Sequence, residues 1–441
     1  MADLNGLTFF IKTFGCQMNE NDSERIAGLL AAAGARKVER FEDGQVVIVN
    51  SCAVRAKSEE KLLSYLGRLG SWKKKRGLVI GLAGCVAQLY REKILVKNPD
   101  VDFVVGPDNY HLLPEILSHG LGPKPVITSW ACDWNEDERQ PFMRESPVSA
   151  YVTIMEGCDN FCAYCVVPFT RGREKFRPLR AILGEVASLA RDGYKEIQFL
   201  GQNVNSYKDP ETGALFQSLL KASDDIKGVE WIRFITSHPK NFSGDIAEAM
   251  ARSKKVCSHL HLPLQSGSTP VLERMKRGYT REDYLGTIRL LRSLMPGISL
   301  STDIIVGFPG ETEREFEETM SALEAIRFAN IFSFRYSPRP GTAAAKLDDD
   351  VPFDVKRRRL LEVQKRQKAI QTEIHKGFIG RTIKVLCLGK SKKDKRIYSG
   401  RSEGYQVVNF TSEQNAIGRF VRVRVKDSGP YSLGGDFCEE G

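Results

Sequence analysis

Segments typical of short buried strands alternate with segments typical of amphipathic helices along most of this 441-residue chain. In the middle of the chain the predicted strands lie near residues 151–155, 196–200, 231–236, 260–264, 299–306 and 330–336. Between them, apolar residues recur every three or four positions, which predicts helices at residues 180–192, 242–251, 281–294 and 313–326. Successive strand–helix units produce parallel strands, so this region predicts a partial (β/α)6 barrel with its chemistry in the loops at the strand carboxyl ends.

The amino-terminal region repeats the same alternation three times, with a cysteine after each strand. Strand-like runs at residues 7–14, 46–49 and 78–82 come just before Cys16, Cys52 and Cys85. Helical patterns follow at residues 21–33, 58–69 and 88–96, with caps expected at Asn21 or Asp22 and at Ser58. The pattern predicts an open, mostly parallel α/β sheet whose strand ends bring the three cysteines together. Cluster ligands and small buried hydrophobic side chains are both compatible with such positions.

Three further cysteines, Cys158, Cys162 and Cys165, have the spacing Cys-x3-Cys-x2-Cys after the first strand of the middle region. Three thiolates can hold a [4Fe-4S] cube and leave its fourth iron open to a small molecule. The main alternative is a structural zinc site, but such a site needs four ligands, and no histidine or fourth cysteine follows nearby. A disulfide framework fits less well, because ten scattered cysteines without a signal peptide are typical of a reduced cytoplasmic protein.

The other four cysteines fall outside both patterns, and we interpret them as structural: Cys132, Cys257, Cys387 and Cys438. No apolar run approaches the roughly 20 residues that span a bilayer, so we expect no membrane segment. The chain has 65 basic and 55 acidic side chains, and its net charge of +10 favours an anionic partner without naming one.

The carboxyl-terminal residues 376–441 carry much of this charge, with 13 basic against 7 acidic side chains. Short strand patterns at residues 382–388, 398–401, 406–410 and 419–425 predict a small β-barrel. Lys390, Lys392, Lys393, Lys395 and Arg396 form a basic turn, whereas Arg422 and Arg424 share one face of a strand. Such a surface is either simply solvated or binds nucleic acid.

The segments around these cysteines resemble the tRNA methylthiotransferases of the radical S-adenosylmethionine (SAM) superfamily. Besides the cluster loop, the resemblance is carried by residues 151–157, Val-Pro-Phe-Thr-Arg-Gly-Arg-Glu at 167–174, Leu-Gly-Gln-Asn-Val-Asn-Ser at 200–206 and Thr-Ser-His-Pro at 236–239. It extends over almost the whole chain. Within the family, these segments are most similar to the enzymes that act on isopentenyladenosine beside the tRNA anticodon.

The resemblance implies a division into domains and a role for each cysteine trio. Residues 1–125 would form a methylthiotransferase domain with an auxiliary [4Fe-4S] cluster on Cys16, Cys52 and Cys85. After a linker at 126–143, the radical SAM core would span 144–375 and hold the catalytic [4Fe-4S] cluster on Cys158, Cys162 and Cys165. Residues 376–441 would form a TRAM RNA-binding domain.

The resemblance also implies two sets of ligand contacts. The polar side chains expected to border the SAM pocket are Gln202, Asn203, Ser237 and Gln265. The basic side chains expected to contact RNA are Lys392, Lys393, Lys395, Arg396, Arg422 and Arg424.

The implied reaction adds a methylthio group to carbon 2 of N6-isopentenyladenosine at position 37 of tRNA. One SAM would give the 5′-deoxyadenosyl radical, and a second would methylate sulfur from the auxiliary cluster. The expected partners are the tRNA anticodon stem-loop, an electron donor such as flavodoxin or ferredoxin, and an iron–sulfur carrier for cluster repair; we expect a cytoplasmic monomer. The alternatives are a methylthiotransferase for a ribosomal-protein aspartate or for threonylcarbamoyladenosine in tRNA and, more distantly, a non-enzymatic iron–sulfur RNA-binding protein.

Overall fold

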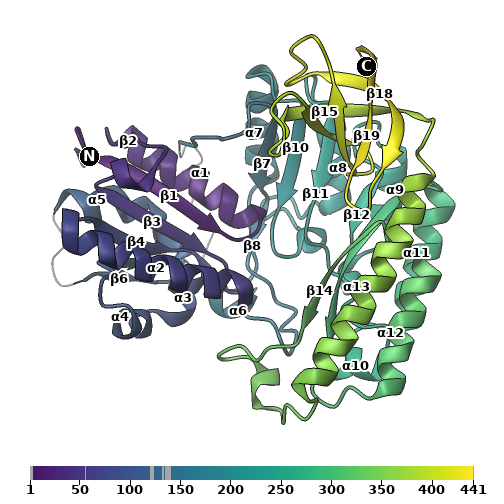
Figure 1. The fold of residues 1–441 in the computed structure, drawn as a ribbon, viewed down its shortest axis with the longest axis horizontal. Coiled ribbons are helices and arrows are strands. Elements are labelled where there is room, and N and C mark those ends of the chain that lie inside the picture. Colours follow the sequence, from purple (N-terminus) through teal and green to yellow (C-terminus); the bar gives the residue numbers. More distant parts are fainter. Residues whose placement is uncertain (1–2, 55, 120–123, 132–133, 135–140, 441) are drawn as a thin grey trace.

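The structure is a computed structural model that describes residues 3–54, 56–119, 124–131, 134 and 141–440. An amino-terminal α/β region, a central strand–helix region and a carboxyl-terminal barrel follow one another, coloured purple to blue, teal to green, and yellow in Figure 1. Part of the predicted linker, including Cys132, lies outside the described residues.

The amino-terminal region is a parallel sheet with the strand order β2-β1-β3-β4-β5-β6. Its strands are β1 (Thr8–Phe14), β2 (Arg36–Lys37), β3 (Val46–Ser51), β4 (Val79–Ala83), β5 (Phe103–Val105) and β6 (Val126–Ile127). Its helices are α1 (Gln17–Ala32), α2 (Ala56–Arg76), α3 (Cys85–Tyr90), α4 (Lys93–Lys97) and α5 (Leu113–Ser118). In β3, Val47 packs with Leu66 of α2, whereas Ile48 packs with Leu30 of α1. Helices therefore cover both faces, which explains why β3 is buried along its whole length.

Three details of the predicted helices in this region are wrong. Helix α1 begins at Gln17 with Cys16 as its N-cap, because Asn21 and Asp22 bond to the central region instead of capping. Ser58 lies inside α2, which begins at Ala56. The helix predicted at 88–96 is divided into α3 and α4 by Arg91, whose φ of 49° is in the left-handed region that a right-handed helix does not adopt.

The central region contains two parallel three-stranded sheets, ordered β11-β10-β7 and β12-β13-β14. Their strands are β7 (Ser149–Thr153), β10 (Glu196–Leu200), β11 (Trp231–Phe234), β12 (His259–His261), β13 (Ser299–Val306) and β14 (Asn330–Arg335). The sheets meet where the Ile232 N–H donates to the Lys255 carbonyl at 2.8 Å and the Cys257 N–H to the Ile232 carbonyl at 2.9 Å. The predicted partial barrel is thereby confirmed.

The helices of the central region lie on the outside of this barrel (Figure 1). They are α7 (Leu179–Arg191), α8 (Phe216–Asp224), α9 (Gly244–Arg252), α11 (Arg281–Leu294), α12 (Glu313–Ile326) and α13 (Phe353–Lys376). The shorter elements are β8 (Met155–Glu156), β9 (Lys175–Phe176), α6 (Val167–Thr170), α10 (Thr269–Arg274) and the 3₁₀ turns η1 (Phe41–Asp43), η2 (Pro107–Leu112), η3 (Val204–Ser206), η4 (Pro239–Asn241) and η5 (Ala343–Lys346). None of the helices in the described residues is long and apolar enough to cross a bilayer.

The carboxyl-terminal strands form a closed barrel in the order β15-β16-β17-β19-β18, which confirms the predicted fold. They are β15 (Thr382–Lys390), β16 (Tyr398–Ser402), β17 (Val407–Thr411), β18 (Phe420–Ser428) and β19 (Leu433–Glu440). The sequence did not predict β19. Its Leu-Gly-Gly-Asp start lacks the β-branched residues typical of strands, and it becomes a strand by pairing with β17 and β18.

This barrel docks on the amino-terminal ends of the central strands. The rings of Trp231 and Phe420 meet edge to face with centroids 4.8 Å apart, and His259 stacks on Tyr405 at 4.7 Å. The buried Arg233 guanidinium donates to the carbonyls of Ser402 at 2.8 Å and Glu403 at 2.7 Å. The cysteine loop follows the other ends of the strands, so the basic barrel and this loop lie at opposite ends of the central barrel (Figure 1).

Candidate active site

Cys16, Cys52 and Cys85 come together at the carboxyl ends of three neighbouring strands, β1, β3 and β4. The Cys52 N–H donates to the Phe14 carbonyl at 2.9 Å, which holds the first two loops side by side. The Cys52 thiol donates a hydrogen bond that lowers the pKa of Cys16 to about 6 and raises that of Cys52 well above its usual value. One sulfur of this pair is therefore a thiolate near neutral pH, the form that binds metal.

The chain makes room for these cysteines with a glycine. Gly84 has a φ of +88° and directly precedes Cys85, and a Cβ there would lie 2.2 Å from Asn50 Oδ1. The Asn50 side chain in turn donates to the Asn19 carbonyl at 2.9 Å and accepts from the Asn19 side chain at 3.0 Å. Only glycine permits this close approach, so the backbone of the three loops is held in one arrangement.

Arg171 reaches this trio from the central region. Its side chain is 2% exposed, forms a short ion pair with Asp22 and lies 3.7 Å from Glu156. Burial raises the pKa of Cys85, and the Arg171 charge opposes that rise. The guanidinium also helps to lower the pKa of Cys16. A buried cation from one region thus faces the thiols of another, where negative charge would accumulate on a bound cluster.

Cys158, Cys162 and Cys165 lie in one folded loop after β8. The Cys158 N–H donates to the Gly172 carbonyl at 3.2 Å, and the Cys165 N–H donates to the Cys162 carbonyl at 3.0 Å. Burial raises the pKa of Cys158 to about 11 and that of Cys165 to about 12, and the neighbouring thiol of Cys162 contributes to both. The three sulfurs are therefore close enough to influence one another, and without metal they favour the protonated form.

Each sulfur of this loop is next to a nitrogen. Asn160 Nδ2 lies 3.6 Å from the Cys158 sulfur, and the Val167 N–H donates to the Cys165 sulfur at 3.5 Å. Cys162 has two such neighbours, Arg277 at 3.4 Å and His238 Nε2 at 3.5 Å. Hydrogen bonds to sulfur tune the potential of iron–sulfur clusters, so this environment suits a thiolate cluster.

The roles of His238 and Arg277 were not foreseen. His238 is buried and accepts from the Lys240 N–H through Nδ1 at 3.2 Å. Burial lowers its pKa to about 2, so the neutral ring carries its proton on Nε2, the atom that faces Cys162. Arg277 lies in a turn far from the cysteine motif, and nothing in the local sequence marks it.

The zinc and disulfide alternatives receive no support from the described residues. Every described cysteine is a free thiol, so no disulfide joins any two of them. Zinc draws its ligands to about 2.3 Å from one centre, whereas a cube distributes its thiolates over separate irons. Each trio, three thiols without a fourth ligand, therefore fits a [4Fe-4S] cluster better than a single ion.

The four side chains expected to border the SAM pocket lie at the ends of β10, β11 and β12. Gln202 accepts from the Gly157 N–H at 2.5 Å and so supports the cysteine loop. The other three each bury an oxygen that has no hydrogen-bond partner among the described residues: Asn203 Oδ1, Ser237 Oγ and Gln265 Oε1. An unpaired buried polar atom costs about 1–3 kcal/mol, so these oxygens are suited to a polar ligand.

The backbone at the same strand ends is strained. Thr236 and Gln265 have φ angles of 75° and 71°, and Phe161 in the cysteine loop has 45°. Such conformations cost non-glycine residues about 1–3 kcal/mol and gather at functional sites. The strained positions and the unpaired oxygens thus mark the same end of the barrel.

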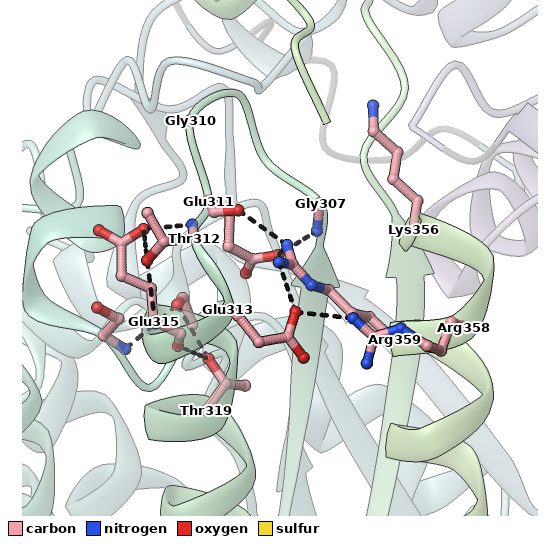
Figure 2. Close-up of polar contacts among 12 residues, drawn as sticks. Gly307, Gly310, Glu311, Thr312, Glu313, Glu315, Thr319, Lys356, Arg358 and Arg359 are labelled. Atoms are coloured by element: carbon pink, nitrogen blue, oxygen red, sulfur yellow. Dashed lines mark hydrogen bonds and ion pairs between the residues drawn. The ribbon is translucent and has the colours of Figure 1, made fainter. Parts of the chain in front are cut away.

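The loop after β13 is fixed by a buried ion pair that Figure 2 shows. Glu311 accepts from the Gly307 N–H at 2.5 Å and from Arg359 of α13 at 2.8 Å, and these two side chains are 0% and 4% exposed. Arg359 also donates to the Glu311 carbonyl at 2.9 Å and to Glu313 at 3.0 Å. Helix α13 therefore holds the loop from Gly307 to Glu311 in place.

The two cysteine-bearing regions share one packed interface. Val166, next to Cys165, is buried in the same hydrophobic cluster as Cys85 and Val86, and α3 contacts α6. Lys175 forms an ion pair with Asp108 at 2.8 Å in which both side chains are less than a tenth exposed. Because α3 begins at Cys85 and α6 follows Cys165 closely, this interface places the two trios on adjoining elements.

The basic residues of the carboxyl-terminal barrel are on its surface. Lys392, Lys393, Lys395 and Arg396 are exposed in the turn between β15 and β16, where Arg396 pairs with Asp394 at 2.9 Å. Arg422 and Arg424 occupy the exposed side of β18, alternating with buried valines as predicted.

Comparison with known proteins identifies each region separately. Residues 8–106 match the family described as Uncharacterized protein family UPF0004, residues 152–323 match the Radical SAM superfamily, and residues 376–438 match the TRAM domain.

Over its whole length the chain is similar to proteins named tRNA-2-methylthio-N(6)-dimethylallyladenosine synthase. The protein from Acetivibrio thermocellus is 44% identical over 432 residues, covering 97% of this chain and 90% of the relative. That from Thermodesulfovibrio yellowstonii is 44% identical over 437 residues, covering 98% and 99%. Among solved structures, the radical SAM methyltransferase TsrM from Kitasatospora setae has a TM-score of 0.54 at 14% identity over 90% of this chain and 81% of that chain, a likeness of fold alone.

Proposed function

The chain belongs to the tRNA-2-methylthio-N(6)-dimethylallyladenosine synthase family of radical SAM enzymes, and on that premise we propose how its residues perform the reaction. The activity adds a methylthio group to carbon 2 of N6-isopentenyladenosine at position 37 of tRNA. The observation that carries the assignment is the similarity over 97% of the chain to enzymes of this name. The two cysteine trios on adjoining elements agree with it.

Cys158, Cys162 and Cys165 are the proposed ligands of the radical SAM cluster. When bound, such a cluster supplies the electron that cleaves SAM at its open iron. The chain contributes the thiolates and the nitrogens around them. The donors at Cys162, His238 Nε2 and Arg277, offset the negative charge that a cluster brings into a buried site.

Asn203, Ser237 and Gln265 are the proposed SAM contacts. Their unpaired buried oxygens accept hydrogen bonds, so they suit the groups of SAM that donate, namely its ammonium, ribose hydroxyls and adenine amino group. Gln202 has a positioning role instead, because its side-chain oxygen holds the Gly157 N–H at the start of the cysteine loop.

Cys16, Cys52 and Cys85 are the proposed ligands of a second, auxiliary cluster that provides the transferred sulfur. The thiolate character of Cys16 and the buried Arg171 charge support this assignment. Reacting groups must be held close together for sulfur to be transferred between them. The packing of α3 against α6 serves this requirement, because it keeps the two cysteine trios near each other.

The carboxyl-terminal barrel is the proposed grip on tRNA. Lys392, Lys393, Lys395, Arg396, Arg422 and Arg424 are exposed and suit phosphate contacts, which position RNA without reading its sequence. Further proposed partners are an electron donor such as flavodoxin or ferredoxin and an iron–sulfur carrier. A monomer is a further proposal. Location in the cytoplasm is our remaining one, and the free thiols of the described cysteines agree with a reducing compartment.

The test uses anaerobically reconstituted full-length protein with reductant, SAM and tRNA that carries isopentenyladenosine. Nucleosides are analysed by mass spectrometry, and Cys158→Ala and Cys52→Ala serve as separate controls. We expect a methylthio product from the wild-type protein only, and 5′-deoxyadenosine from the wild type and Cys52→Ala but not from Cys158→Ala. A product on tRNA carrying threonylcarbamoyladenosine, with none on isopentenyladenosine, would contradict the proposed substrate.

A further inference from the structure

A surface hollow of about 660 Å³ opens where the two cysteine-bearing regions meet. One wall consists of Gln88 and Leu89 of α3, the helix that begins at Cys85, and of Arg91 directly after it. Another consists of Phe169 and Arg173, which follow Cys165. Its size is that of a pocket for a small molecule or a nucleobase with its sugar.

Large aromatic rings are exposed in and beside this hollow. Trp130 and Phe169 line it and are both 40% exposed, and Phe161 beside it is 42% exposed. Trp130 lies over Gly172, where a Cβ would come within 3.2 Å of the indole. Apolar surface of this kind, concentrated in one place, marks an interaction site. We call Trp130, Phe161, Phe169 and Arg173 the aromatic hollow.

The charges around the aromatic hollow are positive. Arg91, Lys93 and Arg173 are exposed and line the cavity, and its described lining contains no Asp or Glu. The Arg173 guanidinium lies 5.0 Å from the centre of the Phe161 ring. The Arg173 side chain forms an ion pair with Asp159 at 3.1 Å, and this pair is weak because both side chains are exposed. Arg173 can thus turn toward a phosphate at little cost.

We infer that the aromatic hollow binds unpaired nucleotides of the tRNA anticodon loop, next to the adenosine that is modified. Surfaces that bind single-stranded nucleic acid combine exposed aromatic rings with basic side chains. The rings stack on the bases, and the basic side chains contact the phosphates. The recessed shape suits one base better than the flat contact of a docking protein. This inference rests on the proposed function for the identity of the RNA, and it adds a second RNA contact to that of the carboxyl-terminal barrel.

The experiment measures binding of reconstituted full-length protein to an anticodon stem-loop and to a closed duplex of the same stem, by fluorescence anisotropy. We expect Trp130→Ala and Phe169→Ala each to weaken stem-loop binding by about 5- to 150-fold, with binding of the duplex unchanged. Arg173→Gln should reduce the slope of log K against log[salt] by about 0.7. Iron content and thermal unfolding of each variant verify that it has folded.

Phe353→Ala is the matched control. Phe353 is 64% exposed and has Arg335 4.5 Å from its ring centre, so it reproduces the exposed ring with a cation outside the aromatic hollow. Stem-loop binding should be unchanged in this variant.

The outcomes separate this inference from the proposed function. If the wild type modifies tRNA and the Trp130→Ala and Phe169→Ala variants bind the stem-loop like Phe353→Ala, the inference is overturned and the function stands. If those variants lose loop binding while the wild type forms no methylthio product, the aromatic hollow is supported and the proposed function is not. Unchanged RNA binding with slower reduction by flavodoxin would overturn the inference and assign the surface to an electron donor.

Discussion

Replacing Arg359 by methionine would leave Glu311 buried without its counter-charge. The carboxylate is 0% exposed, and its remaining hydrogen bond would be that from the Gly307 N–H (Figure 2). Removing one partner of a buried ion pair costs about 3–5 kcal/mol, because the other charge remains desolvated. Burial already raises the pKa of Glu311, and the Gly307 N–H and the Arg359 charge oppose that rise, so the variant keeps only the Gly307 contribution.

The assay is hydrogen exchange at the Gly307 amide, read against amides of the amino-terminal sheet as an internal reference. Whole-chain unfolding is a poor measure here, because a chain with several regions does not unfold in two states. At about 1.4 kcal/mol per factor of ten, a loss of about 3–5 kcal/mol accelerates exchange from local opening by two to three and a half orders of magnitude. The loss should shrink as pH falls, since the carboxyl can then take up a proton and become neutral.

Arg358 provides the control on the same helix. Its side chain is 47% exposed and pairs with Glu313 and Glu362, so Arg358→Met should change Gly307 exchange by less than about fivefold. The double variant Glu311→Met with Arg359→Met should recover part of the loss, because no unpaired charge remains. Equal acceleration by Arg358→Met and Arg359→Met would refute the reasoning.

Three further predictions concern charge. Arg171→Met should lower the iron bound per chain after reconstitution toward half, because the auxiliary thiols lose their buried cation. Arg171→Lys keeps the charge and should lose less iron. Equal iron in the Met and Lys variants would count against charge compensation. Burial keeps the pKa of His259 well below its usual value, so below about pH 6.5 the opened chain binds a proton that the folded one does not. Hydrogen exchange of the β12 amides should show local stability falling by up to about 1.4 kcal/mol per pH unit in the wild type relative to His259→Gln, and parallel pH curves would contradict this. Exchanging Arg422 and Arg424 for glutamine should reduce the salt slope of tRNA binding by about 1.4–1.8, and an unchanged slope would show that these side chains do not contact phosphate.

The parts of the fold that repeat were predictable from the sequence. Strand–helix alternation gave the parallel strands, and parallel strands place Cys16, Cys52 and Cys85 at one sheet edge. The parts that depend on tertiary contact were not. Helix α13 carries many charges and has a weak amphipathic pattern, and it is fixed because buried side chains such as Arg359 and Gln367 bond to distant loops.

The candidate site divides in the same way. Its cysteines could be found because their spacing is local, whereas Arg277 lies more than a hundred residues from Cys162, whose sulfur it contacts. Asn21 and Asp22 seemed suited to begin a helix, since such side chains commonly cap. Their side chains instead bond Thr153 and Arg171 across the interface, an outcome that only the packed regions determine.

The basic barrel docks on the amino-terminal ends of the central strands, so the length of these strands sets its distance from the cysteine loop. Strands of five to eight residues, such as β7 and β13, rise about 3.3 Å per residue and separate the two sites by roughly 17–26 Å. A free nucleoside can occupy only one of the two sites. A ligand long enough to reach both sites makes its second contact at high effective concentration. The enzyme would therefore prefer an RNA of sufficient length over a free nucleoside, before any base is recognised.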